Sequence, residues 1–330
     1  MSDYYRQISS AKDTYERIAM EAGNKANGST VTLLIKAILG GWMVGLGGYA
    51  ASVIASLYYV PNTSNATAKT AFAIVFPVAL MSILFTGSDL YTGNTMCFTF
   101  ALFNKKINAL TYVLKLMVSI AGNFVGTSLA ALVLTGGTGH FMKDTGAGAE
   151  YMVSLARAKT SLPFWRVMLS AVGCNSLVCL AVWMFYCSYD SGGACLNILG
   201  HIGAFAVAGL EHIIANFYIL NAALLSRSGI TFVDVYVHNF IPTWLGNTIA
   251  GVFVLGVPMS LLYNQPSKEG TLEYSRSLRS MQRTTSADIV INTTGTYSHE
   301  RLGVERVSKC YLRLKTSEHE DLLSPVLGGS

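Results

Sequence analysis

The sequence predicts an all-α membrane protein whose six transmembrane helices form an inverted repeat of two three-helix halves. Three observations lead to this prediction. The chain is 52% apolar and only 12% charged, well below the roughly 25% of charged residues in a soluble domain. Six apolar segments are each long enough to cross a bilayer core, which takes about 20 helical residues. Polar motifs of one type recur in the two halves at nearly one spacing.

Charged side chains are distributed unevenly and divide the chain into three parts. Residues 31–264 contain ten basic and six acidic side chains, whereas the two flanking segments hold the other twenty-five. We therefore expect a six-span membrane domain at 31–264, a cytoplasmic N-terminal tail at 1–30 and a largely disordered cytoplasmic C-terminal tail at 265–330. Apolar side chains at helical spacing in the N-terminal tail indicate a short amphipathic helix on the membrane surface.

Each apolar segment is expected to form one membrane-spanning helix. The N-terminal tail lacks the short apolar stretch and cleavage site of a secretory signal, so the first span is expected to remain in the membrane. The expected spans are residues 31–58, 71–103, 107–136, 162–187, 193–225 and 232–264.

The second and fifth spans are interrupted by polar segments that contain glycine. Residues 87–94 (GSDLYTGN) and 209–216 (GLEHIIAN) both read Gly-x-acid-x-x-x-x-Asn and start 122 residues apart. Gly-Asn pairs in the third and sixth spans, at 122–123 and 246–247, lie 124 residues apart. Two kinds of landmark thus repeat at nearly one period, which predicts a duplicated three-span unit.

Because three spans are an odd number, the second copy must enter the bilayer from the opposite side. Inverted repeats with broken helices that meet near the midplane are typical of transporters. Non-helical backbone at membrane depth is tolerated only where protein encloses it or where it lines a cavity. We therefore expect the broken-helix loops to line a transport path, through Gly87, Asp89, Gly93, Asn94, Gly209, Glu211 and Asn216.

Six spans place both chain termini on the same side of the membrane. Lys105 and Lys106 follow the second span and the N-terminal tail holds four basic residues, whereas Lys69 and Lys159 are among the basic residues of the other face. Basic connections favour the cytoplasmic side. We therefore expect both termini in the cytoplasm.

Asp89 and Glu211 occupy equivalent positions in the two interrupted spans. An ionisable group at membrane depth is costly and is by default a candidate for function. A carboxylate at these positions could also hydrogen-bond the N–H groups that a broken helix exposes. We expect this structural capping role for both residues.

His212 has no counterpart in the first half, where the matching residue is Leu90. A residue that only supports the fold tends to be duplicated with it, whereas one proton-handling site on a pseudo-symmetric path need occur only once. Histidine titrates near pH ~6.5 and is suited to proton exchange. Two interpretations remain open, a proton or substrate site and a hydrogen-bonded core histidine.

Lys36 lies five residues into the first span. Its long side chain could extend to the membrane interface, as lysines near helix ends often do. It could instead attract anions at the mouth of a pore, and the residues leave this choice open.

Five of the six cysteines lie in or beside apolar segments without paired spacing, so we expect neither a disulfide framework nor a metal site.

Four motifs together resemble the formate/nitrite transporter family over roughly residues 31–264. They are TGSDLYTGNT at 86–95, VGCN at 172–175, GLEHIIAN at 209–216 and LGN at 245–247. Among the branches of the family, the chain is most similar to the lactate/formate–proton transporters of apicomplexan parasites.

The resemblance implies a homopentamer of aquaporin-like protomers in which each protomer has its own substrate path and needs no cofactor. It implies transport of small monocarboxylates (lactate, formate, acetate, pyruvate) together with protons across the plasma membrane, so that 31–264 is a transport domain and the chain is not an enzyme. The expected partners are these substrates, protons, membrane lipids and other copies of the chain, with no nucleic acid.

The resemblance also assigns roles to residues by position. It implies a central proton or substrate site at His212, Thr92, Asn175 and Asn247, and a cytoplasmic vestibule with Lys36 as anion attractor. The implied constrictions are Phe76 and Phe205 on the outward side, and Leu80, Leu90, Tyr91 and Val178 on the cytoplasmic side.

Physical chemistry favours the neutral acid as the permeating species. An isolated carboxylate costs up to tens of kcal/mol in an apolar constriction, and an acid with a pKa of about 3.9 is only about one part in a thousand neutral at pH 7. We therefore expect the anion to gather in a vestibule and to take up a proton there.

The competing hypotheses are a passive small-anion channel, an aquaporin-type channel and a membrane hydrolase. The chain contains no Asn-Pro-Ala motif and no Gly-x-Ser-x-Gly turn, which disfavours the last two.

Overall fold

The computed structural model describes residues 8–142, 146–226 and 229–264. Within them, six apolar helical spans are long enough to cross a membrane, which confirms the predicted fold class. The expected N-terminal tail lies partly outside the described residues, and the expected disordered tail at 265–330 lies wholly outside them.

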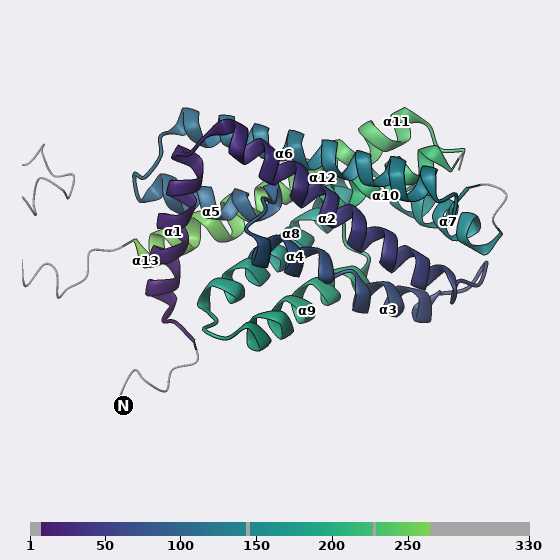
Figure 1. Cartoon of the computed structure of the whole chain (residues 1–330), viewed down its shortest axis with the longest axis horizontal. Coiled ribbons are helices and arrows are strands. Elements are labelled where there is room, and N and C mark those ends of the chain that lie inside the picture. Colours follow the sequence, from purple (N-terminus) through teal and green to yellow (C-terminus); the bar gives the residue numbers. More distant parts are fainter. Residues whose placement is uncertain (1–7, 143–145, 227–228, 265–330) are drawn as a thin grey trace, which may run out of the picture. The chain divides into compact units, whose positions relative to one another are not determined.

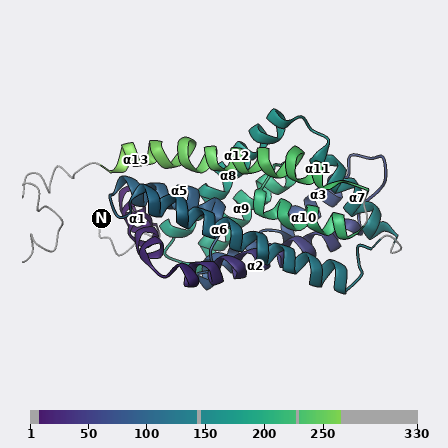
Figure 2. The ribbon, with the colours of Figure 1, turned by 90° about the horizontal axis from the view of Figure 1, so that it is seen from above.

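The spans follow the predicted order, and two further helices, α1 (Ala11–Asn27) and α7 (Ala147–Thr160), precede the first and fourth spans. Figure 1 shows α1 across one end of the helical bundle and α7 at the other, and Figure 2 shows the sixth span as one long helix along an edge. The spans are formed, in order, by α2 (Thr30–Ser56); α3 (Ala66–Val75), α4 (Val78–Thr86) and α5 (Tyr91–Phe103); α6 (Ala109–Ala130) and η2 (Ala131–Gly137); α8 (Phe164–Cys187); α9 (Ser191–Ala208) and α10 (Ile213–Leu225); and α11 (Phe232–Val235), η3 (Tyr236–Phe240), α12 (Ile241–Ile249), η4 (Ala250–Gly256) and α13 (Val257–Tyr263).

The second and fifth spans are broken where the sequence predicts. α4 ends at Thr86 and is followed by Gly87 with φ of 67°, and α9 ends at Ala208 and is followed by Gly209 with φ of 70°. Glycine adopts this left-handed conformation without the steric penalty of other residues and ends a helix there. Helix resumes at Tyr91 and at Ile213, so each break is three residues long after the glycine.

Three residues expected in the broken-helix loops lie instead in helices. Gly93 and Asn94 belong to the first turn of α5, and Asn216 belongs to the first turn of α10. The expectation was wrong because a partner from another span stabilises each helix start. The N–H of Tyr91 donates to Asn123 Oδ1 and that of Ile213 donates to Asn247 Oδ1, both at 2.8 Å.

Equivalent hydrogen bonds in the two halves confirm the repeat. The Nδ2 of Asn123 donates to the carbonyls of Ala37 and Asp89, and the Nδ2 of Asn247 donates to those of Ala171 and Glu211. Each Gly-Asn pair seen in the sequence thus supplies the amide that joins a broken span to the first span of its half. A buried amide with all these bonds fixes the break at one place.

α2 and α6 cross so closely that no side chain larger than glycine fits between their backbones at Gly126. A Cβ at Gly126 would lie 2.0 Å from the carbonyl oxygen of Ile38 and 2.7 Å from the nitrogen of Trp42. Small residues at such crossings let helix backbones approach in membranes, where apolar burial gives little driving force.

Gly126→Ala is therefore expected to destabilise the protein by about 3 kcal/mol or more, because both clashing groups are backbone atoms that cannot rotate away. The matched control is Gly200→Ala in α9, where a Cβ would meet no atom within 4 Å. Thermal stability by size-exclusion chromatography of heated, detergent-solubilised protein checks this, and equal melting of the two variants would contradict the crossing.

Candidate functional site

A half-buried ion pair lies beside the first break, at the end of the bundle where α1 lies. The Nζ of Lys25 is 3.0 Å from Oδ1 of the fully buried Asp89. The Nδ2 of Asn94 donates to both oxygens of this carboxylate, at 2.9 and 2.8 Å, and the hydroxyl of Ser119 donates to Oδ2. Lys25 also donates to Asn94 Oδ1 at 3.3 Å. The carboxylate is therefore compensated by one cation and two neutral donors.

The pKa of Lys25 lies above the ordinary lysine value. Burial is the largest single influence and lowers this pKa, but the negative charge of Asp89, followed by the effects of Cys97, of the hydrogen bond to Asp89 and of Glu21, together outweigh it. Lys25 thus remains charged at neutral pH, and the pair with Asp89 is an ion pair.

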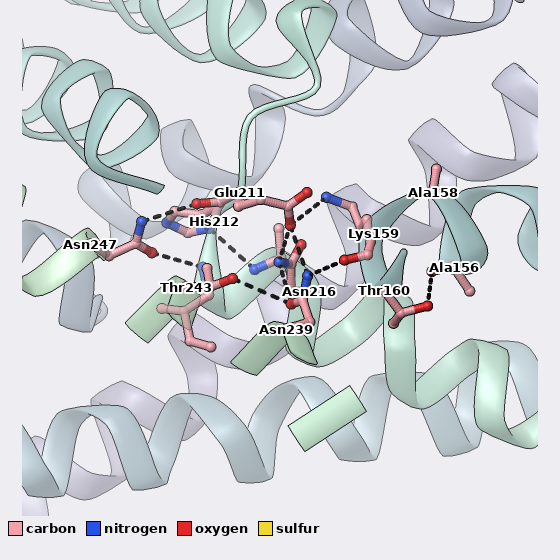
Figure 3. A network of polar contacts seen from close by, with 12 residues as sticks. Ala156, Ala158, Lys159, Thr160, Glu211, His212, Asn216, Asn239, Thr243 and Asn247 are labelled. Atoms are coloured by element: carbon pink, nitrogen blue, oxygen red, sulfur yellow. Dashed lines mark hydrogen bonds and ion pairs between the residues drawn. The ribbon is translucent and has the colours of Figure 1, made fainter. Parts of the chain in front are cut away.

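A second ion pair lies beside the second break, near α7 (Figure 3). The Nζ of Lys159 is 3.1 Å from Oε2 of Glu211, and both side chains are buried. The same oxygen accepts from Nδ2 of Asn216 at 2.5 Å and from Nδ2 of Asn239 at 3.1 Å. Asn239 also donates to the backbone carbonyl of Lys159 at 2.8 Å, which holds α7 against the sixth span.

The two ion pairs are equivalents in the repeat. Lys159 follows Lys25 by 134 residues, the same interval that separates the matched carbonyls of Ala37 and Ala171. α1 is therefore the counterpart of α7, and each half consists of a short helix followed by three spans. Neither lysine stands out in the sequence, because the most visible repeat is that of the broken spans, whose motifs lie 122 residues apart. Two lysines that each lie twelve residues before an equivalent alanine were the available signal.

The carboxylates do not cap the broken helices, contrary to expectation. Among the described residues, Asp89 and Glu211 accept only from side chains, and Asn123 and Asn247 bond the first helical N–H groups. The breaks at Asp89 and Glu211 instead expose carboxylates that a lysine from a preceding helix can reach. Their role is to attach α1 and α7 to the broken spans.

His212 lies at the centre of the bundle and links the two broken spans. Its Nε2 is 2.9 Å from Thr92 Oγ1, and its Nδ1 accepts from the backbone N–H of Ala215 at 3.1 Å. An Nδ1 that accepts carries no hydrogen, so the neutral ring has its hydrogen on Nε2 and donates it to Thr92. The ring also stacks on Phe205, with centroids 5.7 Å apart.

Asn175 and Asn247 lie near this pair but do not hydrogen-bond the imidazole. Nδ2 of Asn175 donates to the backbone carbonyls of Thr92 and Asn247 at 3.3 and 2.6 Å. Asn247 bonds the backbone on both sides of His212, through the carbonyl of Glu211 and the N–H of Ile213. Both asparagines therefore position the chain around Thr92 and His212 rather than the ring itself.

The N-termini of two half-helices meet at this centre. α5 starts next to Thr92 and packs against α1, whereas α10 starts next to His212 and packs against α7, so the two half-helices run towards opposite ends. A helix N-terminus carries a partial positive charge. The centre of the bundle is thus favourable for a carboxyl oxygen and unfavourable for an added proton on the imidazole.

A narrow apolar cavity adjoins His212. Its volume is about 20 Å³, about enough for one water molecule. Five residues expected at constrictions line it: Phe76, Leu80, Leu90, Val178 and Phe205. Tyr91 is not among the lining residues, and its hydroxyl hydrogen-bonds Thr248 at 2.8 Å. Val44, Ala79, Ile83 and Ile202 also line the cavity, and their plain apolar character gave no signal in the sequence.

A larger cavity opens at each end of the bundle. The α1 vestibule, of about 460 Å³, is lined by residues including Glu21, Lys25 and Lys36. The α7 vestibule, of about 270 Å³, is lined by residues including Lys69, Lys159 and Glu211, and it shares Phe76 and Phe205 with the central cavity. These two rings, whose centroids are 5.9 Å apart, therefore separate the α7 vestibule from His212.

Comparison with known proteins gives consistent results. The sequence profile described as "Formate/nitrite transporter" matches residues 12–261. The chain is 36% identical over 282 residues to the formate-nitrite transporter of Plasmodium falciparum, which covers 83% of this chain and 90% of that protein. It is 36% identical over 254 residues to formate-nitrite transporter 3 of Toxoplasma gondii, covering 76% of this chain and 50% of that one.

Two solved structures have the same fold. A structure described as an FNT family ion channel has a TM-score of 0.68 and 28% identity, covering 77% of this chain and 99% of that chain. A pentameric formate channel with formate bound has a TM-score of 0.62 and 22% identity, covering 72% and 98%. Six spans, matching broken helices and a profile match over three quarters of the sequence show that this multi-pass membrane protein belongs to the formate/nitrite transporter family.

Proposed function

We propose that this protein carries small monocarboxylates, such as formate and lactate, together with protons across the plasma membrane, as a homopentamer with both termini in the cytoplasm. The α1 vestibule is then the cytoplasmic mouth and the α7 vestibule the outer mouth. The observation that carries the proposal is the central cavity, whose described lining holds one ionisable side chain, His212, among aliphatic and aromatic residues.

A carboxylate ion cannot cross such a cavity at a useful rate, because its desolvation in apolar surroundings is not offset by a fixed charge. The corresponding neutral acid carries no net charge, so its desolvation on entering the cavity costs much less free energy. Transport therefore requires that the anion takes up a proton before it reaches Phe76 and Phe205 on one side, or Leu80 and Leu90 on the other.

The vestibules supply the conditions for that protonation. Lys36 lines the α1 vestibule, and in the described part of the chain its Nζ has no hydrogen-bonding or ionic partner. Its charge can raise the local concentration of anions. As the anion loses water towards the constriction its proton affinity rises, and a proton from the bulk solution reaches it through the water of the vestibule.

His212 acts in this proposal as a neutral hydrogen-bonding residue. Protonating Nδ1 would break its bond from Ala215 and add a positive charge at the N-terminus of α10, which the helix dipole opposes. The Thr92 hydroxyl, which accepts from Nε2, keeps its own hydrogen for the carboxyl group of the passing acid. The imidazole thus orients the donor and carries no proton itself.

Uptake of labelled formate and lactate into proteoliposomes with an imposed pH step tests the proposed function. A one-to-one symport should accumulate substrate about tenfold for each pH unit, because 1.4 kcal/mol corresponds to a factor of ten. The competing passive anion channel predicts substrate flux that follows membrane voltage and is not driven by pH. Such voltage-driven flux without accumulation on a pH step would refute proton coupling.

His212→Asn separates a neutral histidine from a proton relay. Asparagine is a good helix N-cap and retains a donor and an acceptor, but it does not titrate near neutral pH. We expect the rate of uptake to fall several-fold as the shorter side chain loses Thr92, while the steady-state lactate ratio at a fixed pH step remains that of the wild type. Loss of accumulation in a correctly assembled variant would instead show that His212 relays protons.

A further inference from the structure

The charges of the α7 vestibule do not cancel. Three charged residues line it, namely Lys69, Lys159 and Glu211. Lys159 and Glu211 form the buried ion pair and contribute little net field. The ammonium of Lys69 has no carboxylate within ion-pair distance and no hydrogen-bonding partner in the portion of the chain that the structure describes. One exposed positive charge therefore dominates this mouth.

Helix stability does not explain this lysine. Lys69 lies in the first turn of α3, which contains no acidic residue. A cation near a helix N-terminus is opposed by the helix dipole, which favours Asp or Glu there. Lys69 is also exposed, so it fills no space in the core. Its position is unfavourable for α3 and is accounted for by the cavity that it lines.

The opposite mouth is arranged in the same way. In the α1 vestibule, Lys25 is neutralised by Asp89, and Glu21 pairs with Arg17 at 3.2 Å. Lys36 is left without a partner, as Lys69 is in the α7 vestibule. Lys36 and Lys69 lie on helices that are not equivalents in the repeat. The two mouths thus share one charge pattern, an ion pair and an unpaired lysine, although both unpaired lysines belong to the first half of the repeat.

We propose that Lys69 is the anion-capture residue of the α7 vestibule, which concentrates monocarboxylate anions in front of Phe76 and Phe205. This inference rests on the proposed transport of such anions. Lys69 forms no fixed contact with the substrate. It acts through its charge, so the size and sign of that charge determine its effect, and salt weakens it.

Charge replacement at one cysteine tests the proposal. Lys69→Cys is reconstituted into proteoliposomes and treated from outside with methanethiosulfonates that carry a trimethylammonium, a sulfonate or only a methyl group. The thiolate attacks the thiosulfonate sulfur, a mixed disulfide forms and methanesulfinate leaves. The three products differ in charge at one site. The charged reagents do not cross the membrane, so they reach only vestibules that face outward.

The expected result follows the sign of the charge. At about 10 mM ionic strength, Lys69→Cys should raise the KM for formate about threefold with little change in maximal rate. The trimethylammonium product should restore the KM, the sulfonate product should raise it further, and the methyl product should leave it unchanged. At about 150 mM salt these differences should shrink.

Treated wild type controls for native thiols, of which four described ones are buried and Cys195 is half-buried. Lys36→Cys in the α1 vestibule should be insensitive to charged reagents added at the α7 side. A wild-type KM in Lys69→Cys at low ionic strength, or the same effect from both charged reagents, would overturn the role of Lys69 but would leave the proposed function standing. A wild-type protein that moves no formate would overturn both this role and the proposed function.

Discussion

Lys159→Met is expected to cause the largest loss of stability, about 3–5 kcal/mol, because it leaves Glu211 as a buried charge without a counter-ion. The Glu211 side chain is 3% exposed, and Asn216 and Asn239 compensate only part of its charge. Adding Glu211→Gln should recover most of the loss, since the neutral amide still accepts a hydrogen bond through its carbonyl oxygen. Thermal stability of the two single variants, the double variant and the wild type gives the coupling energy between the two sites.

The equivalent pair provides a graded comparison. Lys25 is 28% exposed in its side chain, so water can partly solvate Asp89 when the lysine is removed. Lys25→Met should therefore lower the free energy of unfolding less than Lys159→Met does. Additive effects of Lys159→Met and Glu211→Gln would show that the 3.1 Å contact contributes nothing, and α7 would then be held by Asn239 and by its packing against α2 and α10.

Phe205→Ala is expected to produce the largest change in selectivity. The ring lines both the central cavity and the α7 vestibule, so its removal widens the passage without adding charge. The ratio of butyrate to formate flux should rise about tenfold, because a single methylene in an apolar pocket already discriminates about 10- to 200-fold. Competition between labelled formate and unlabelled acids of increasing length measures this ratio.

Phe72→Ala is the matched control for that experiment. Phe72 lines the α7 vestibule and stacks on Phe76 with centroids 5.2 Å apart, but it does not line the central cavity. Its loss should leave the size profile unchanged. An unaltered profile in correctly folded Phe205→Ala, or an equal shift in both variants, would remove Phe205 from the constriction.

The membrane domain follows from local sequence properties that need no tertiary information. Span length and low charge determine the six helices, and glycines at 87 and 209 mark the breaks because no other residue adopts a positive φ so readily. The interval of 122 residues between the two motifs gave the inverted repeat. The position of His212 without a counterpart was also visible in the sequence, as were five of the residues that line the central cavity.

The extent of each loop was not visible, and neither was the partner of each buried charge. Gly93, Asn94 and Asn216 are expected in loops from the sequence. They are helical because the side chains of Asn123 and Asn247, which belong to other spans, accept from the first N–H groups of α5 and α10. Tyr91 turns to Thr248 because a hydroxyl partner lies there. Such contacts join residues far apart in the chain, and no local pattern encodes them.

The sequence by itself determined the spans, the breaks and the twofold relation of the halves, because these depend on transfer free energy and backbone conformation residue by residue. Only the tertiary structure decided that Lys25 and Lys159 neutralise Asp89 and Glu211 and that Lys36 and Lys69 are left unpaired at the two mouths. The physical reason is that the field of a lysine depends on the distance to the nearest carboxylate, and folding alone sets that distance.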